Sequence, residues 1–515
     1  MRLGGRVTLI VLVLAAGPSL GQAAETGWTQ GRGDAGRSGI ALLPGTPLDV
    51  VGTFNMLDAD QALNVAGDGL AWTPWGIVGV EQPNLPNPTS TCRLFRFDLD
   101  TGVTTRVTEI PCPEGARLGG YDPVNDIAIV CVDGTPDDLL VRAFDSRSGA
   151  EAWGARPEIS LAEARGVADQ NEWACQSPAI DSDAGVAYVA FGNEQIGRHV
   201  IQAVSLVDGS TLWASTMPAT AFTGSSSPMP PTTLGAVSGQ VQGFNVDGVT
   251  LTDTGLVLFG RAGARTLAPA YAWMGLDGTP VGAVLPYSGD FARAAAARLP
   301  TGQSGLASAS GDRAAALLTG ELVFINPLST DPEVIPIPDA PLFGTAPLAW
   351  SDETIAIPLA TSVVLYDTRA PDEPSRWAGD QGGSVLAVVL APPGDAYVVT
   401  SRGTPNGVSV TLTRIDMATT RSVQQVPIPS IFDCCPRVLG VPDGLVLFEI
   451  GQVGGRIVHL SKTDDSLRPT IAVGSDFPAA GEPFTLTIAA SRRASVAVAW
   501  GDGVVERVEP GAVAT

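Results

Sequence analysis

A recurring strand and turn pattern limits the folds that this 515-residue chain can adopt. Each copy contains an apolar strand with alternating character, a turn with Asp beside Ser or Gly, and a short second strand that often carries Thr, Val or Trp. The clear copies are Phe95–Gly102, Arg142–Gly149 and Ala203–Gly209, and the weaker ones are Trp273–Gly278, Phe324–Leu328, Val364–Thr368, Thr413–Ala418 and Ile457–Thr463. Alternation buries one face of a strand, and Asp, Ser and Gly suit tight turns, so each copy predicts an antiparallel hairpin.

Units of this kind fold only by packing against one another. A small four-stranded sheet cannot bury its own apolar faces, so neighbouring sheets must stack in a ring. The copies divide residues 26–467 into eight units of about 55 residues, somewhat longer than a compact four-stranded blade. The composition, with 60 Gly, 41 Pro and 16% charged residues, also favours short strands and tight turns. We therefore predict an all-β protein whose main domain, residues 26–467, is an eight-bladed β-propeller.

The two ends of this domain indicate how the ring closes. The last unit has only three predicted strands, Arg437–Val441, Gly444–Ile450 and Arg456–Leu460. An additional strand, Leu48–Phe54, precedes the first complete unit. If Leu48–Phe54 pairs with Arg456–Leu460, it completes the last blade and removes an exposed sheet edge.

A segment before the first unit and the turns of the clearest units carry a family resemblance. The segment is Trp28–Gly39, and two of the clear units lead from an Asp turn to Trp153 and to Trp213. Together they resemble the PQQ-like β-propellers of the quinoprotein alcohol dehydrogenase-like superfamily. The resemblance covers residues 26–467 and is most specific in the first three units. It implies a fold more than a reaction, because many members resemble scaffolds and binding modules.

The pattern changes after Arg468. Strand-like segments at Pro469–Ile471, Ala480–Ile488 and Ser495–Trp500, followed by a Gly-Asp-Gly turn, resemble the front half of a PKD-type immunoglobulin-like domain. A complete sandwich of this kind has about seven strands in about 100 residues. We therefore predict a partial β-sandwich over residues 468–515. The resemblance implies a spacer or an adhesive unit.

The first residues predict export. Residues 1–23 contain Arg2 and Arg6, the apolar run Val7–Ala16 and small residues before an expected cleavage site, which are the parts of a secretory signal peptide. The apolar run is shorter than the roughly 20 residues of a membrane-spanning helix. We therefore expect a mature chain without a transmembrane segment, located outside the cell, in the periplasm or at the cell envelope.

An exported chain with an even number of cysteines is expected to contain disulfide bonds. The cysteines are Cys92, Cys112, Cys131, Cys175, Cys434 and Cys435. The first two lie on successive predicted strands and are the first candidate pair, which leaves Cys131 for Cys175. The adjacent Cys434 and Cys435 could form a vicinal disulfide or remain two thiols.

No catalytic, cofactor-binding or metal-binding set can be assigned from the residues. His199 and His459 are the two histidines, which is too few for a His-rich metal site, and we expect both to be ordinary strand or turn residues. The chain has no Gly-x-Ser-x-Gly motif.

Pairs of acidic residues leave two further possibilities open. The pairs are Asp98 with Asp100, Asp137 with Asp138, and Asp181 with Asp183. Turn geometry already explains aspartates in these contexts. Calcium binding at one pair, or carboxylate chemistry at the propeller mouth, stays open.

The family resemblance raises the question of a bound quinone. Cys434 and Cys435 resemble the vicinal disulfide beside the cofactor of quinoprotein dehydrogenases. In those enzymes the pair lies early in the propeller, whereas here it opens the last unit. The family's calcium ligands cannot be placed by motif, and we predict no cofactor.

The charge and the pattern together favour a binding protein. A net charge of −23 without a basic run argues against nucleic acid as a partner. The main hypothesis is a non-catalytic exported propeller that binds a protein or glycan partner, or acts as a scaffold. The alternative is an exported enzyme, either a quinoprotein-like oxidoreductase or a carboxylate-dependent hydrolase or lyase, with its site in the propeller channel.

Overall fold

The computed structural model describes most of the propeller region and four short strands beyond it. The described residues are 41, 43, 47–58, 61–62, 65–81, 91–112, 115–133, 141–153, 173–176, 178–193, 198–216, 244–262, 268–284, 308–318, 321–329, 332–337, 348–351, 353–370, 374–379, 383–391, 394–404, 407–428, 436–448, 455–462, 470–473, 486–489, 496–499 and 505–508. The predicted signal peptide, Trp28–Gly39 and the pair Cys434 and Cys435 lie outside the described residues.

Antiparallel sheets follow one another along the chain, each built from strands close in sequence. The first sheet contains β3 (Val65–Thr73), β4 (Gly76–Glu81), β5 (Thr91–Phe97) and β6 (Thr104–Pro111). The second contains β7 (Gly115–Asp122), β8 (Ile127–Asp133) and β9 (Val141–Asp145). The third contains β10 (Ala174–Cys175), β11 (Ala179–Asp181), β12 (Val186–Asn193), β13 (Arg198–Ser205) and β14 (Thr211–Ser215).

The middle of the chain repeats this arrangement. The fourth sheet contains β15 (Phe244–Leu251), β16 (Gly255–Ala262), β17 (Ala268–Gly275) and β18 (Pro280–Val284). The fifth contains β19 (Ser308–Ser310), β20 (Arg313–Leu318), β21 (Glu321–Ile325) and β22 (Glu333–Pro336). The sixth contains β23 (Ala349–Trp350), β24 (Thr354–Pro358), β25 (Ser362–Asp367) and β26 (Ser375–Ala378).

The last two sheets complete the series. The seventh contains β27 (Ser384–Ala391), β28 (Asp395–Thr404), β29 (Gly407–Asp416) and β30 (Arg421–Ile428). The eighth joins β31 (Arg437–Val441), β32 (Gly444–Phe448) and β33 (Gly455–Lys462) to β1 (Leu48–Asp58) and β2 (Gln61–Ala62).

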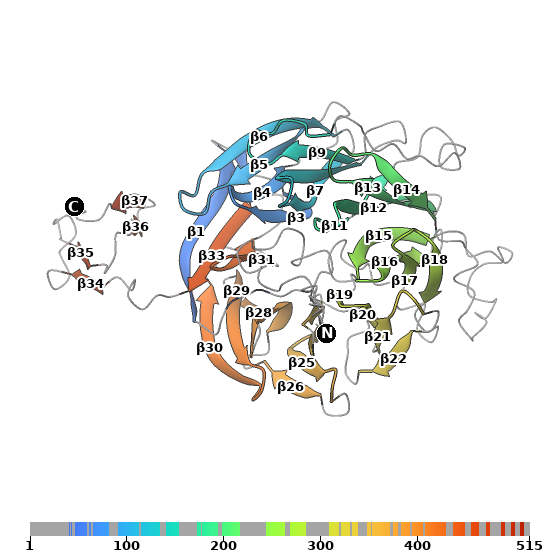
Figure 1. Ribbon diagram of the computed structural model, residues 1–515. Coiled ribbons are helices and arrows are strands. Elements are labelled where there is room, and N and C mark those ends of the chain that lie inside the picture. Colours follow the sequence, from blue (N-terminus) through green and yellow to red (C-terminus); the bar gives the residue numbers. More distant parts are fainter. Residues whose placement is uncertain are drawn as a thin grey trace, which may run out of the picture.

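These sheets stand around a common centre, with the later strands of the first seven sheets toward the outside (Figure 1). In the eighth sheet, β1 lies outside β33. This is the architecture of a β-propeller, as predicted. Eight sheets of this kind occur among the described residues. Eight as the blade count of the whole propeller stays a prediction, because the segments between several sheets lie outside those residues.

The strand β1 pairs with β33 as predicted. The two strands are antiparallel, with Leu48 opposite Lys462 and Phe54 opposite Ile457. Since β33 also pairs with β32, and β32 with β31, one strand from the start of the domain completes a sheet from its end. The edge that β33 would otherwise present is thereby covered.

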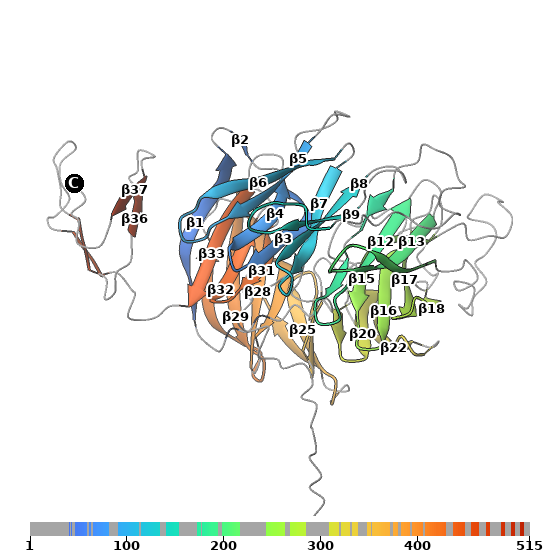
Figure 2. The ribbon, with the colours of Figure 1, turned by 45° about the horizontal axis from the view of Figure 1, so that its top comes forward.

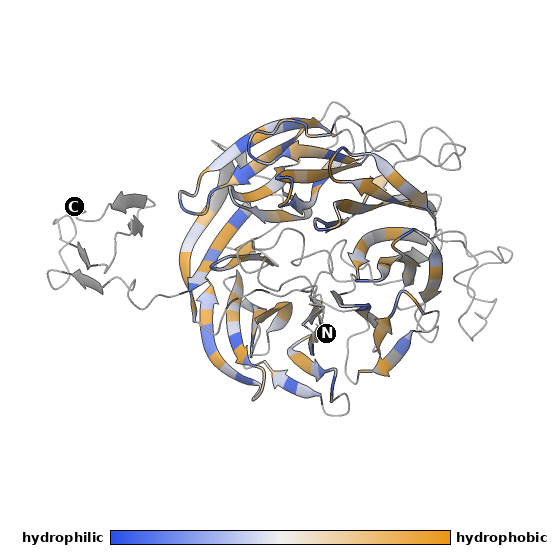
Figure 3. Ribbon diagram, in the orientation of Figure 1, coloured by the Kyte–Doolittle hydropathy of each residue, from blue (hydrophilic) through white to orange (hydrophobic). Residues whose placement is uncertain are grey.

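Neighbouring sheets share apolar cores, and this explains why many strands read as continuous apolar runs. In β16, Leu256 and Leu258 pack in a cluster with the third sheet, whereas Val257 and Phe259 pack in a cluster with the fifth. Successive side chains of a strand point to opposite faces, so alternate residues serve two different cores. Figure 3 shows hydrophobic residues along strands all round the ring.

Tryptophan side chains connect adjacent sheets. The indole N–H of Trp153 donates to the carbonyl oxygen of Leu206 at 3.0 Å, and that of Trp213 donates to Leu276 at 3.0 Å. Both acceptors lie in turns of the next sheet along the chain. Trp153 and Trp213 therefore pack between blades.

The second sheet differs from its prediction. A short outer strand is predicted at 150–153, but the described residues extend this sheet only by an isolated bridge between Phe144 and Glu151. Arg142 holds Glu151 through two hydrogen bonds of 3.1 Å. Trp153, two residues further, is buried in the core shared with the third sheet. The chain therefore leaves the sheet edge early, and its tryptophan fills the space between the blades.

Both disulfide bonds predicted among the first four cysteines are present. Cys92 of β5 is bonded to Cys112, which follows β6, with their Cα atoms 5.7 Å apart. Cys131 of β8 is bonded to Cys175 of β10, with their Cα atoms 5.2 Å apart. The first bond lies within the first sheet, whereas the second joins the second sheet to the third.

Two small sheets follow the ring. β34 (Thr470–Val473) pairs with β35 (Leu486–Ala489), and β36 (Val496–Ala499) pairs with β37 (Val505–Val508). Both sheets lie apart from the ring in Figures 1 and 2. The assignment of this region to a PKD-type domain stays a prediction.

Candidate functional site

Tight turns gather at one end of the ring. In the second sheet, the backbone N–H of Ser146 donates to the carbonyl of Asp126 at 3.0 Å, which joins the β7–β8 turn to the turn after β9. In the third sheet, Leu206 donates in the same way to Gly185 at 2.9 Å. Equivalent bonds run from Thr368 to Glu353, from Met417 to Gly394 and from Lys462 to Asp443. We call this end of the ring the turn face.

The turn face exposes apolar side chains. Val207 is 74% exposed, Leu328 is 70% exposed and Val124 is 66% exposed. Val103 and Trp75 lie in other turns of this face, and Trp75 is 38% exposed. Single exposed apolar residues are ordinary, so these side chains mark candidate contact positions on the turn face.

Trp75 occupies the centre of a polar cluster between the first two sheets. Its indole N–H donates to Oδ2 of Asp126 at 2.9 Å. The guanidinium carbon of Arg147 lies 4.5 Å from the centroid of the Trp75 ring, which is the geometry of a cation–π contact. The side chain of Trp75 is therefore exposed and yet fixed in orientation from two directions.

Asp126 organises this cluster. Oδ1 of Asp126 accepts hydrogen bonds from the hydroxyl groups of Tyr121, at 2.9 Å, and Ser146. Burial, followed by the hydrogen bond to Asp126, raises the pKa of Tyr121 well above its ordinary value. Asp126 has a φ of 55°, a left-handed conformation that an Asp tolerates better than most residues. A turn held this firmly keeps Trp75 and its neighbours in place.

Aspartate side chains cap other turns of the same face. Oδ1 of Asp98 accepts the N–H groups of Asp100, at 2.8 Å, and Thr101, at 2.9 Å. Similar capping bonds occur at Asp145, Asp208, Asp277 and Asp416. Hydrogen bonds from the turns, the largest cause in each case, lower the pKa of these last four carboxyl groups. These groups therefore hold their negative charge at neutral pH.

Capping also accounts for two of the predicted acidic pairs. Asp98 caps its turn as described, and Oδ1 of Asp181 accepts the N–H of Ala184 at 3.0 Å. Asp137 and Asp138 lie outside the described residues. Among the residues that the structure describes, no group of three or more His, Cys, Asp or Glu is placed to hold a metal ion.

Both histidines are strand residues, as expected. His199 lies in β13 and His459 in β33, and both are buried. Nε2 of His459 lies 3.5 Å from Oδ1 of Asp443, and this proximity lowers the pKa of the Asp443 carboxyl group. The two histidines belong to different sheets, the third and the eighth.

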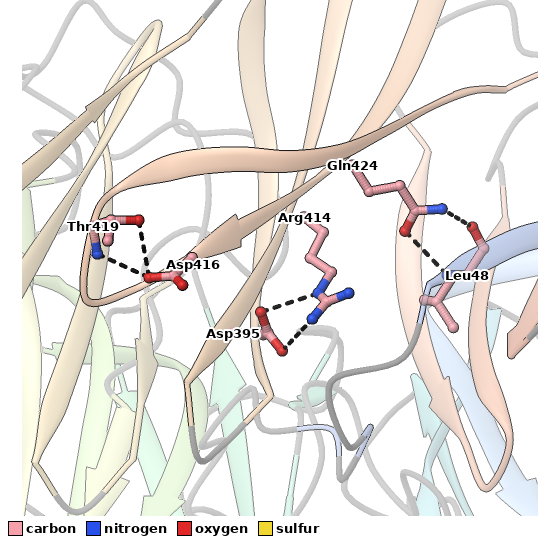
Figure 4. A network of polar contacts seen from close by, with 6 residues as sticks. All are labelled: Leu48, Asp395, Arg414, Asp416, Thr419 and Gln424. Carbon is pink, nitrogen blue, oxygen red and sulfur yellow. Dashed lines mark hydrogen bonds and ion pairs between the residues drawn. The ribbon is translucent and has the colours of Figure 1, made fainter.

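Other polar contacts near the ring closure are structural (Figure 4). Arg414 makes two hydrogen bonds of 3.0 Å to the carboxylate of Asp395, within the seventh sheet. Burial is the main cause that raises the pKa of the neighbouring Tyr397, to about 12. The side-chain amide of Gln424 bonds the backbone of Leu48 in the next sheet.

The tryptophans of the two clearest repeats are not free to stack on a quinone. Trp153 and Trp213 are both engaged between sheets. Cys434 and Cys435 lie outside the described residues. No step of a mechanism is therefore derived through a quinone.

Comparisons with known proteins support the fold. No protein family profile matches the chain, and no curated protein matches its sequence. A europium-containing methanol dehydrogenase aligns over 86% of this chain and 99% of its own, with 10% identity and a TM-score of 0.50. BamB from Moraxella catarrhalis aligns over 80% and 97%, with 12% identity and a TM-score of 0.44. Sqt1 from Saccharomyces cerevisiae aligns over 81% and 100%, with 11% identity and a TM-score of 0.47.

The ring of sheets, together with the likeness to the methanol dehydrogenase, defines the class of the protein as a β-propeller. At such an identity the likeness concerns the fold alone. No helix long and apolar enough to cross a membrane occurs in the part of the chain that the structure describes.

Sequence reasoning missed Trp75. A signal was present, because Pro74 and Trp75 form the tip of a turn between Thr73 and Gly76. A large aromatic side chain at the tip of a tight turn has little of its own hairpin to cover it. Its partners Asp126 and Arg147 come from another sheet, however, so only the folded structure identifies the cluster.

Proposed function

We propose that this chain is an exported, non-catalytic propeller that binds a protein partner through its turn face. The observation that carries the proposal is the exposure of Val124, Val207 and Leu328 at three turns of that face. Backbone hydrogen bonds between paired turns hold much of this surface rigid, so binding a partner would cost little ordering of the backbone. Aliphatic side chains in such positions suit a protein surface better than a sugar.

The proposed organisation follows the sequence. Residues 1–23 act as a signal peptide, residues 26–467 form the binding propeller, and residues 468–515 form a partial PKD-like spacer. The two disulfide bonds support an oxidising location.

Site-specific photo-crosslinking tests this function. A benzoylphenylalanine residue is placed at Val124, Val207 or Leu328, and at Val423 as the control. Val423 is also exposed but lies on the outer strand β30, away from the turns. The labelled proteins are irradiated in the envelope and secreted fractions of the source cells.

The proposal expects one shared protein adduct from the turn positions and none from Val423. The adduct should disappear when Leu328→Asp or Val207→Asp is introduced beside a label at Val124. Equal labelling from Val423, or no turn-dependent adduct, would contradict the proposal.

A further inference from the structure

Four turns from two sheets adjoin one another around Trp75. They are residues 73–76, 98–103, 122–126 and 145–150, and we call them the Trp75 patch. A Cβ added to Gly76 would lie 3.5 Å from Cα of Asp98, so the two turns of the first sheet are in contact. The contacts of Trp75 with Asp126 and Arg147 join them to the second sheet.

The exposed part of this patch is apolar and held in place. Trp75 is fixed by Asp126 and Arg147, and Val103 and Val124 are exposed in adjoining turns. Interface residues that dominate binding energy are often tryptophans, and a fixed side chain loses little conformational freedom on binding. Trp75 therefore has the properties of an anchor residue.

The charge of the patch indicates what it binds. Its acidic residues at the surface are Asp98, Asp100, Asp126 and Asp145, whereas Asp122 is buried, and its one basic residue is Arg147. Capping hydrogen bonds hold the carboxylates of Asp98 and Asp145 in their turns. The apolar centre is thus bordered by fixed negative charge, which is complementary to a positively charged partner.

We propose that the Trp75 patch is a docking site for a segment of the partner protein in which arginine or lysine alternates with aliphatic residues. The contact of Arg147 with Trp75 shows that this indole accommodates a guanidinium group on its surface. The aliphatic residues of the segment would pack on Val103 and Val124. This inference rests on the proposed function, since it names the partner chemistry for one part of the turn face.

Peptide binding to the purified protein tests the inference. The probe is a fluorescein-labelled peptide of alternating Arg and Leu, and matched peptides carry Glu or Ser in place of Arg. Fluorescence anisotropy gives the Kd at low and at physiological ionic strength. The Arg peptide should bind at least about tenfold more tightly than either matched peptide, and its affinity should fall as salt is added.

A pair of substitutions at one exposed position separates the effect of charge on affinity from any effect of misfolding. Val124→Lys and Val124→Glu alter the same side chain, which is 66% exposed, so both proteins should fold. The Kd of the Arg peptide should be at least about tenfold higher for Val124→Lys than for Val124→Glu. Val423→Lys, on the outer strand β30 away from the turn face, is the control and should change the Kd by less than about twofold.

Removal of the anchor gives a second measure. Trp75→Ala should weaken binding of the Arg peptide about tenfold or more. Circular dichroism establishes whether this variant is folded. If it is not, the Kd values of the two Val124 variants alone test whether the patch binds the Arg peptide.

Two results would overturn the inference. One is equal affinity for the Arg, Glu and Ser peptides, and the other is equal weakening by Val124→Lys and Val423→Lys. If either occurs while turn-dependent crosslinks persist, this inference fails and the proposed function stands. If the crosslinks are absent, the proposed function itself fails.

Discussion

The side-chain amide of Gln424 makes two hydrogen bonds to the backbone of Leu48. Its Nε2 donates to the carbonyl of Leu48 at 2.7 Å, and its Oε1 accepts the Leu48 N–H at 3.1 Å. The residues are 376 positions apart, and they join the seventh sheet to the strand that completes the eighth (Figure 4).

Gln424 follows Val423, the extra residue of a β-bulge in β30, and Trp213 likewise follows the bulge residue Leu212 in β14. A bulge re-aims the following side chain, here toward the next sheet.

Gln424→Ala should destabilise the ring at its closure. Two partly buried hydrogen bonds are lost, so we expect the free energy of unfolding to fall by about 2 kcal/mol. Gln424→Glu should also be destabilised at neutral pH, because a carboxylate cannot donate to the Leu48 carbonyl. At acid pH the protonated Glu side chain regains a donor, so its free energy of unfolding should approach that of the wild type. Urea unfolding followed by circular dichroism measures both, with Val423→Ala as the control.

Gly278→Ala should destabilise the protein more than Gly185→Ala. Both glycines have positive φ values, 80° and 69°, so both substitutions carry a similar backbone cost. A Cβ at Gly278 would lie 2.6 Å from the ring of Trp213, whereas one at Gly185 would meet nothing within 4 Å. Overpacking should add about 1–3 kcal/mol at Gly278. In a Trp213→Leu background the difference in stability between the two glycine variants should shrink. Thermal unfolding measures this difference, and an unchanged difference would contradict the prediction.

Loss of the bond between Cys131 and Cys175 should cost more stability than loss of the bond between Cys92 and Cys112. The first closes a loop of 44 residues and the second a loop of 20. Chain entropy alone gives stabilisations of about 4 and 3 kcal/mol. The longer loop also spans two sheets, so its bond restrains how they pack. Urea unfolding of the two double Cys→Ala variants measures both losses of stability. A larger loss for the bond between Cys92 and Cys112 would contradict the prediction.

Asp145→Asn should lower stability at neutral pH but not in strong acid. The pKa of Asp145 is lowered in the folded chain, chiefly by the hydroxyl of Ser148. Its ionised form therefore stabilises the fold above the unfolded pKa of about 4, and this contribution is lost as the pH falls through the folded pKa. Melting temperatures of variant and wild type should differ above about pH 4 and converge below it. Asp183→Asn removes the same charge from another turn and serves as the control.

Addition of pyrroloquinoline quinone and calcium should produce neither bound cofactor nor dehydrogenase activity. The tryptophans of the clearest repeats, Trp153 and Trp213, are engaged in packing between sheets. Absorbance after reconstitution and a dye-linked alcohol assay provide the measurement. Stoichiometric binding with turnover that Cys434→Ser and Cys435→Ser abolish would support the quinoprotein alternative.

The strand pattern of the propeller could be read from the sequence because its determinants are local. Alternation within Ala203–Ser205 and the turn residues Asp208 and Gly209 are sufficient to indicate a hairpin. Even the pairing of Leu48–Phe54 with β33 was accessible, since a three-stranded last unit leaves an edge that only a strand from elsewhere can cover. The disulfide partners followed from the same order of strands.

The contacts that Trp75 and Gln424 make between sheets were decided by the tertiary structure alone. Trp75, Asp126 and Arg147 come from three turns in two sheets, and no periodicity along the chain relates them. The same holds for Gln424 and Leu48, whose contact depends on a bulge that turns one side chain toward the next sheet. A strand pattern specifies which backbone groups pair within a sheet. Which turns meet, and which side chains remain exposed where they meet, depends on how the twisted sheets pack around the ring.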